Sequence, residues 1–226
     1  MTAAEDLVLL DRPAPEVARL TLNRPERHNA LSIALRDRFS DHCDSIAADT
    51  TVKALIVAGL GPTFSAGFDL GEFESDDPDH QRRLWASADR FHQAIVTFPV
   101  PTIAAVHGPA IAGGFDVATM CDLRVVATTA RFARPEFAWG DILYGVLHDL
   151  VGGAIARELT LAPCDLDAHE AWAKGLVTRL VEPSAVPDTA LDLARSAALP
   201  PRDKLVNAKA KVLRRLALGT TETLQM

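Results

Sequence analysis

The chain has 226 residues, 48% of them hydrophobic and 23% charged, which is enough for a single domain with a full core. Its formal charge of −7 at pH 7 argues against a nucleic-acid surface, and no apolar run approaches the length of a membrane span. Three cysteines without metal-type spacing, and an amino terminus without a signal-peptide pattern, predict a reduced cytoplasmic protein with no metal site.

The chain opens with two predicted strands and a helix. Residues 7–11 and 17–22 alternate or run apolar, and the prolines within 12–15 mark a turn between them. A polar loop follows, and Ser32 has the residue type and position of a helix N-cap. The loop carries three basic side chains that either stay solvated or meet a phosphate group, namely Arg24, Arg27 and His28.

A predicted buried strand at 52–58 runs into the glycine-rich stretch 59–70. A dinucleotide fingerprint fails in this stretch because Phe64 stands where its third glycine should be. A serine-hydrolase elbow at Ser65 also fails, because Thr63 replaces its first glycine. A hydrolase that uses Ser65 is therefore a disfavoured second enzyme class.

A second glycine-rich exit, 107–116, follows another apolar run and leads into a predicted buried helix. The first turn of a helix leaves backbone N–H groups without partners, so Gly113 could present its N–H to an oxyanion. The alternative is that the glycine pair only allows close packing of the chain. Asp116 lies one turn further on. In the first exit, Gly67 permits an unusual turn that aims the N–H of Phe68.

Two further segments carry carboxylates. Residues 72–80, acidic and proline-containing, are predicted to form a surface loop before a helix at 82–96, with a cover over a pocket as the alternative. Glu136 stands among apolar residues after a predicted strand at 122–127. Such a carboxylate is either a hydrogen-bonded structural acid or a proton-transfer residue with a raised pKa.

The remaining elements complete an α/β pattern with helices gathered toward the C-terminal end. Residues 140–153 are predicted to be irregular, although they include Tyr144 and His148. The elements expected after them are helices at 154–161 and 167–173, a strand starting at 175–177, and helices at 185–198 and 201–218.

Three segments form a recognisable set in this order and spacing: 22–31 (LNRPERHNAL), 64–70 (FSAGFDL) and 107–114 (HGPAIAGG). Together they resemble the crotonase (enoyl-CoA hydratase/isomerase) superfamily. The resemblance implies a ββα superhelix with two near-perpendicular sheets in 1–182 and a shortened C-terminal helical region in 183–226. It also implies a homotrimer or homohexamer, a coenzyme A thioester of fatty acid metabolism as substrate, and no metal or redox cofactor.

The resemblance also assigns roles by position. It implies that the thioester oxygen is held by the backbone N–H groups of Phe68 and Gly113. Glu136 would exchange a proton at the α carbon, and Asp116 would orient or deprotonate the water that adds at the β carbon, as in an enoyl-CoA hydratase. The residues implied along the coenzyme A path are Arg27, as a phosphate partner, and Ala66, Asp69 and Leu70.

Departures from the family pattern keep other reactions open. Asp116 is one methylene shorter than the family's usual glutamate, and 142–147 replaces the usual wall beside the acyl group, so that Tyr144 or His148 could enter the site. The alternatives are enoyl- or dienoyl-CoA isomerisation, which needs only Glu136, and decarboxylation or hydrolysis of a coenzyme A thioester. A non-catalytic subunit that binds acyl-CoA is the alternative outside the enzymes.

Overall fold

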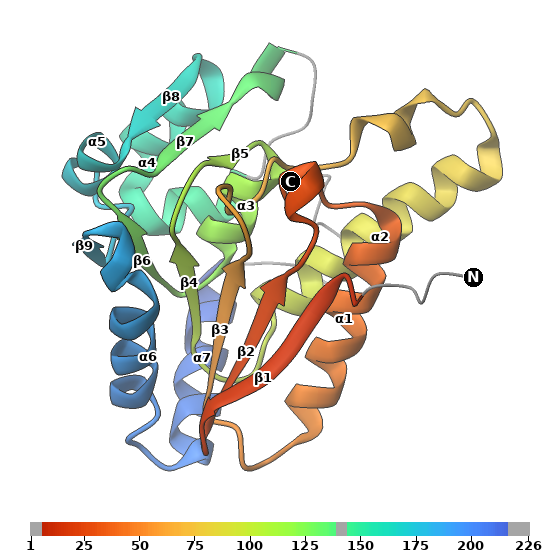
Figure 1. The fold of residues 1–226 in the computed structure, drawn as a ribbon. Helices are drawn as coiled ribbons and strands as arrows, with labels where there is room; N and C mark the ends of the chain where they lie inside the picture. Colours follow the sequence, from red (N-terminus) through yellow and green to blue (C-terminus); the bar gives the residue numbers. More distant parts are fainter. Residues whose placement is uncertain (1–5, 139–143, 217–226) are drawn as a thin grey trace.

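The computed structural model describes residues 6–138 and 144–216 and contains two sheets (Figure 1). The larger sheet has the strand order β1-β2-β3-β4-β6-β9, and the smaller one has the order β5-β7-β8. In the larger sheet β1 and β2 are antiparallel, whereas the other neighbours are parallel. The strands are β1 (Val8–Ala14), β2 (Val17–Leu22), β3 (Ala54–Gly59), β4 (Thr102–Val106), β5 (Ala110–Ile111), β6 (Leu123–Ala127), β7 (Arg131–Arg134), β8 (Cys164–Asp167) and β9 (Arg179–Val181).

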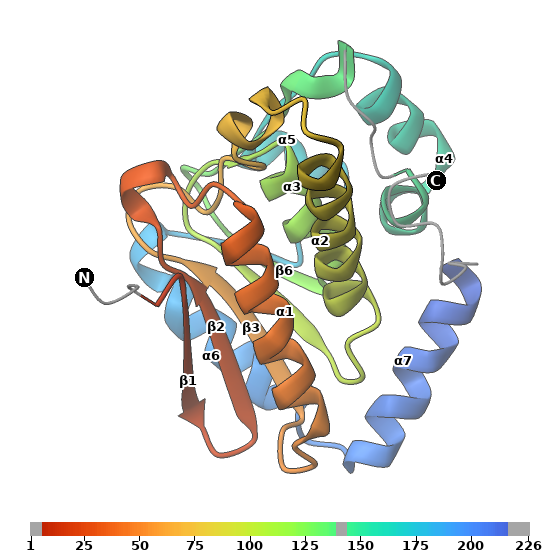
Figure 2. The same cartoon turned by 90° about the vertical axis from the view of Figure 1, so that its right-hand side faces the viewer.

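Helices cover both faces of the larger sheet (Figure 2). On one face α1 packs against β1, β2 and α2, and α7 lies at the rim of this same side against α4; on the other face α6 packs against β3, β4 and β6. No helix in the described part of the chain is long and apolar enough to cross a membrane. The helices are α1 (Ile33–Ala48), α2 (Pro78–Val96), α3 (Gly113–Met120), α4 (Gly145–Leu161), α5 (Ala168–Ala173), α6 (Val186–Ala197) and α7 (Arg202–Leu216), with 3-10 turns η1 (Pro25–Arg27), η2 (Leu70–Glu74), η3 (Pro135–Ala138) and η4 (Pro183–Ala185).

The predicted α/β class is confirmed, and local chemistry explains the elements near its centre. The strand β4 is buried at every position, as expected for a parallel strand covered on both faces. The helix α3 is also buried along its whole length, which its small and apolar residues permit. Ser32 caps α1 as predicted, since its side chain accepts a hydrogen bond from the N–H of Leu35 at 3.3 Å.

The prediction of an acidic loop over 72–80 was wrong. The segment contains most of η2, and α2 already begins at Pro78 rather than near residue 82. The reason is local, because the Asp77 side chain accepts a hydrogen bond from the N–H of Asp79 and a proline at the first helical position needs no acceptor.

Several later boundaries also differ from the predictions. The helix α4 begins at Gly145, within the stretch expected to be irregular, and non-helical backbone at Gly152 (φ 77°, ψ 162°) breaks it into two parts. The strand β8 was not predicted, and the last strand is β9 rather than 175–177. Gly175 instead ends α5 with a φ of 83°, which delays the strand. At the other end of the chain, the turn expected at 12–15 is mostly part of β1, which runs through Pro13. An edge strand tolerates a proline because one side of it has no strand partner.

Candidate active site

Three loops that leave the carboxyl ends of β2, β3 and β4 lie side by side (Figure 1). The N–H of Leu31 donates to the carbonyl of Gly67 at 2.8 Å, and the N–H of Ile111 donates to the carbonyl of Ser65 at 2.9 Å. Ligands of α/β proteins bind outside the carboxyl ends of parallel strands. These hydrogen bonds therefore join the two glycine-rich exits into one surface at the expected edge of the sheet.

Two backbone N–H groups of this surface lack acceptors. Among the described residues, neither Phe68 nor Gly113 donates its N–H to a backbone carbonyl. Gly113 is the first residue of α3, where the helix dipole adds partial positive charge. Gly67 has a φ of 85°, and a Cβ on it would lie 2.9 Å from the nitrogen of Gly113. The two free amides are thus neighbours, an arrangement suited to holding an oxyanion.

Buried polar side chains that the sequence analysis did not single out hold the ring of Phe68. The guanidinium carbon of Arg36 lies 4.6 Å from the ring centroid, and the imidazole of His92 stacks at 5.9 Å. Burial lowers the pKa of His92 to about 3, so its ring is neutral. The Glu72 carboxylate lies 3.7 Å from Arg36 and accepts a hydrogen bond from the N–H of Ile33, which ties η2 to α1. Arg36 and His92 lie on the inward faces of their helices, which is the signal that could have identified them.

Ser65 has a structural role. Its hydroxyl is fully buried, donates to the carbonyl of Asn29 at 2.9 Å and accepts from the N–H of Gly67 at 3.2 Å. A nucleophile needs a neighbouring base to take its proton, whereas this proton is committed to a main-chain oxygen. The geometry does not support a serine hydrolase at this position.

Asp116 is buried in α3 and forms an ion pair with an arginine of β7. Its Oδ1 lies 2.5 Å from Nη2 of Arg134, and the Arg134 side chain has no exposed surface. Burial raises the pKa of the Asp116 carboxyl, and the positive charge of Arg134 opposes that rise. The ion pair favours the charged form of Asp116, against the effect of burial.

Glu136, in η3, is the second buried carboxylate, 7% exposed. Its Oε2 has no hydrogen-bond partner among the described residues. Burial, helped by the charge of Asp116, raises the pKa of Glu136 to about 7, against the opposing effects of a backbone hydrogen bond and of Arg134. Asp116 thus has a direct arginine partner that favours its charged form, and Glu136 is poised to exchange a proton near neutral pH, a division of roles that suits acid–base chemistry.

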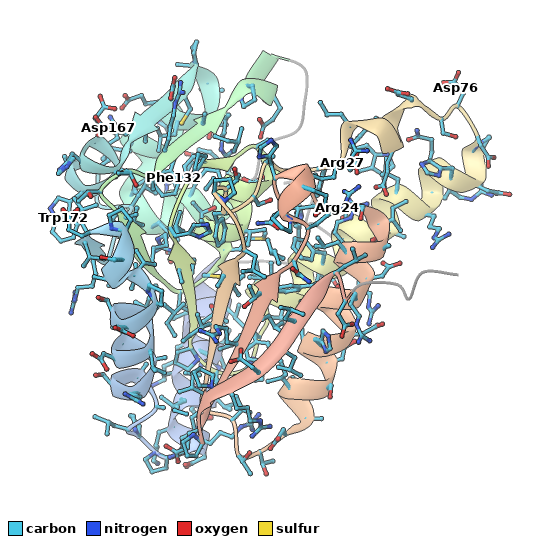
Figure 3. All side chains as sticks on the ribbon, in the orientation of Figure 1. Arg24, Arg27, Asp76, Phe132, Asp167 and Trp172 are labelled. Atoms are coloured by element: carbon cyan, nitrogen blue, oxygen red, sulfur yellow. The ribbon has the colours of Figure 1, made fainter. Side chains whose placement is uncertain are left out.

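The residues expected along the coenzyme A path lie on two loops that are hydrogen-bonded to each other. Arg27 is on the loop after β2 (Figure 3), and Ala66, Asp69 and Leu70 are on the loop after β3. The Asp69 carboxylate is bound by Arg24 at 2.6 Å, and this hydrogen bond lowers the pKa of Asp69. Arg24 is therefore not the free phosphate partner that the loop composition allowed. Arg27 is exposed, and so is Leu70, with 65% of its surface accessible. Ala66 is half-buried, and its N–H donates to the carbonyl of His28.

Tyr144 and His148 lie at the start of α4. Their ring centroids are 5.6 Å apart, and Tyr144 packs against the core. Of the predicted replacement wall 142–147, residues 142 and 143 lie outside the described residues.

Comparison with known proteins agrees with this geometry. The family model of enoyl-CoA hydratase/isomerase matches residues 13–226. A short-chain-enoyl-CoA hydratase of Clostridium acetobutylicum is 33% identical over 193 residues, which cover 83% of this chain and 73% of that protein.

Solved structures show the same likeness. The enoyl-CoA hydratase of Bacillus anthracis superimposes with a TM-score of 0.87 at 26% identity, covering 97% of this chain and 87% of that one. An enoyl-CoA hydratase/isomerase of Xanthobacter autotrophicus gives a TM-score of 0.86 at 34% identity, covering 97% and 83%. The matching sequence and fold place the chain in the enoyl-CoA hydratase/isomerase family of the crotonase superfamily.

Proposed function

We propose that this protein is an enoyl-CoA hydratase, which adds water across the α,β double bond of an acyl-CoA thioester. The observation that carries the proposal is the combination of two neighbouring free amides, those of Phe68 and Gly113, with two buried carboxylates, Asp116 paired with Arg134 and Glu136 with a pKa raised to about 7. The first pair suits an enolate oxygen, and the second pair suits proton transfer at two adjacent carbons.

In the proposed reaction the oxygen of a water molecule bonds to the β carbon. Asp116 orients that water and accepts its proton, while the electron pair of the double bond moves onto the thioester oxygen. The N–H groups of Phe68 and Gly113 stabilise the resulting enolate. Glu136 then delivers its proton to the α carbon, and exchange with solvent returns both carboxyl groups to their starting states. The reaction as proposed uses no metal and no redox cofactor.

The coenzyme A moiety is proposed to cross the exposed residues beside the site. Arg27 is an exposed cation on the loop after β2 and is our candidate phosphate partner. Ala66 and Leu70 would line the path, and Asp69 would shape it through its ion pair with Arg24. Tyr144 remains our candidate for the wall beside the acyl group.

The second candidate is an enoyl-CoA isomerase. Its support is the ion pair that occupies Oδ1 of Asp116, since an isomerase needs Glu136 alone to move a proton. Purified protein incubated with crotonyl-CoA tests the two, because hydration removes the conjugated enoyl absorbance and yields 3-hydroxybutyryl-CoA. Full retention of crotonyl-CoA, with conversion of a 3-enoyl-CoA to its 2-enoyl isomer, would replace the first candidate with the second. Malonyl-CoA and saturated acyl-CoA in parallel reactions report decarboxylation and hydrolysis, and a tight acyl-CoA complex without any product would identify a binding subunit.

The pH dependence of the two reaction directions follows from Glu136. Hydration needs Glu136 protonated, so kcat for hydration is expected to fall as pH rises through about 7. Dehydration of 3-hydroxybutyryl-CoA needs Glu136 ionised and is expected to lose kcat as pH falls through the same value. Initial rates in both directions from pH 5 to 9 check this, and two profiles of the same direction would contradict the role of Glu136.

The resemblance to the superfamily leads us to propose a homotrimer or homohexamer in the cytoplasm. Large apolar side chains remain accessible on the isolated chain, among them Trp172 at 48% and Leu199 at 80%. Light scattering of the purified protein is expected to give three or six times the mass of the chain, and a monomer at micromolar concentration would contradict the assembly.

A further inference from the structure

Arg134 differs in its bonding from the other buried arginine of the central strands. Arg124, in β6, donates to four main-chain carbonyls, for example those of Leu176 at 2.5 Å and Cys121 at 2.6 Å. Arg134 donates through Nη2 to Asp116, and its Nε and Nη1 have no partner among the described residues. Main-chain carbonyls therefore hold Arg124 in place. Arg134 instead has one strong polar contact, which is with the Asp116 side chain of the candidate site.

The position of Arg134 ties both carboxylates together. Residues 132 and 134 of β7 are buried on one face of the strand, and the guanidinium carbon of Arg134 lies 4.8 Å from the ring centroid of Phe115. Phe115 directly precedes Asp116 in α3, and Arg134 stands two residues before Glu136. The charge of Arg134 is therefore held against α3 by Asp116 and Phe115, and it also acts electrostatically on Glu136.

We propose that Arg134 is a positioning residue, which keeps Asp116 ionised and oriented so that Glu136 is the carboxyl group that carries the proton. A buried carboxylate without a cation would take up a proton and lose its capacity as a base. Among the described residues, the charged or titratable groups that face Asp116 are Arg134 of β7 and Glu136 of η3, and Cys164 of β8 lies beside Arg134 in the strand pairing. This inference rests on the proposed hydration, in which Asp116 accepts a proton from water.

Arg134→Gln is expected to lower kcat for hydration of crotonyl-CoA about 100-fold, with KM within about threefold, because a proton acceptor is lost and binding contacts are kept. The acid side of the kcat–pH profile should move upward by a pH unit or more, since Asp116 would then ionise at higher pH. Arg134→Lys, which keeps the charge, should restore part of kcat and of the profile.

Two further variants separate positioning from a merely structural role. Arg131→Gln removes an exposed arginine of the same strand, paired with Asp165 of β8, and should leave kcat and the pH profile unchanged. In the Asp116→Asn background, Arg134→Gln should cost little more, because its effect acts through Asp116. An unshifted acid limb in Arg134→Gln, or an equal loss of kcat in the Asp116→Asn background, would overturn the proposal. If the glutamine variant does not fold, Arg134→Met, which also removes the charge, carries the same two tests.

The failure of the proposed function can be told apart from the failure of this inference. If the wild-type protein hydrates no enoyl-CoA, the proposed function is refuted. The role of Arg134 can still be tested by ¹³C NMR titration of labelled aspartate carboxyl groups. The signal of Asp116 is assigned as the one that is missing in Asp116→Asn. A pKa of Asp116 that is higher in the Arg134 variant than in the wild-type protein supports the positioning role. Equal pKa values in the two proteins would overturn it.

Discussion

Glu136→Gln is expected to lower kcat for hydration about 10³-fold and to leave KM within about threefold. The amide has nearly the shape of the carboxyl group but cannot deliver a proton to the α carbon. The loss corresponds to about 4 kcal/mol in the activation free energy. Steady-state kinetics with crotonyl-CoA measures both constants, and an unchanged kcat would remove Glu136 from the reaction.

The same variant should be more stable than the wild-type protein at alkaline pH. The pKa of Glu136 in the folded state is about 7, above its ordinary value of 4.5, so the folded state binds more protons than the unfolded state between these values. Stability therefore falls as pH rises through this window, and glutamine avoids that loss, by about 3 kcal/mol at pH 8. Urea denaturation at pH 8 and pH 4 checks the sign. The exposed Glu182, replaced by glutamine, serves as a control that should change neither kcat nor stability.

Gly67→Ala is expected to lower kcat at least about 100-fold, because it disturbs both donors of the proposed oxyanion hole. The new Cβ would lie 2.8 Å from the Cβ of Ala112 and 2.9 Å from the nitrogen of Gly113. Those atoms belong to main chain or to a short side chain, so the backbone has to move apart. The N–H of Phe68 follows directly in the chain and would shift with it.

A matched glycine separates this displacement from backbone strain. Gly175 has a φ of 83°, close to the 85° of Gly67, but a Cβ there would meet nothing within 4 Å. Gly175→Ala should therefore share the strain, about 1 kcal/mol of stability, and keep its kcat. If the two alanine variants lost kcat equally, the amides of Phe68 and Gly113 would not be the groups that stabilise the transition state.

Long helices and strands with a regular hydrophobic pattern were predicted well, whereas short strands were not. The buried runs of β3 and β4 and the capped start of α1 have strong local signals. The strand β8 has only four residues, two of them aspartates, and its partner β7 is thirty residues away in the sequence. This segment is a strand because it pairs with β7, and the composition of its four residues does not reveal that pairing.

The candidate site divides in the same way. The two glycine-rich exits and the carboxylates Asp116 and Glu136 could be named from the sequence, because turns and buried acids have characteristic neighbours. The partners that set their electrostatics could not. Arg134 had no local pattern that marked it, and the pairing of Arg24 with Asp69 joins residues that are 45 positions apart. Such pairs depend on which loops the fold lays side by side.

Incubation of the protein with crotonyl-CoA in heavy water, followed by mass spectrometry of the thioester, tests the central claim most directly. The measurement reports water addition at the β carbon and proton delivery at the α carbon together. The account predicts 3-hydroxybutyryl-CoA that carries a deuterium at the α carbon. It also predicts that Glu136→Gln nearly abolishes the formation of this product. Deuterium uptake into crotonyl-CoA without addition of water, or no change in the thioester at all, would contradict hydration at this site.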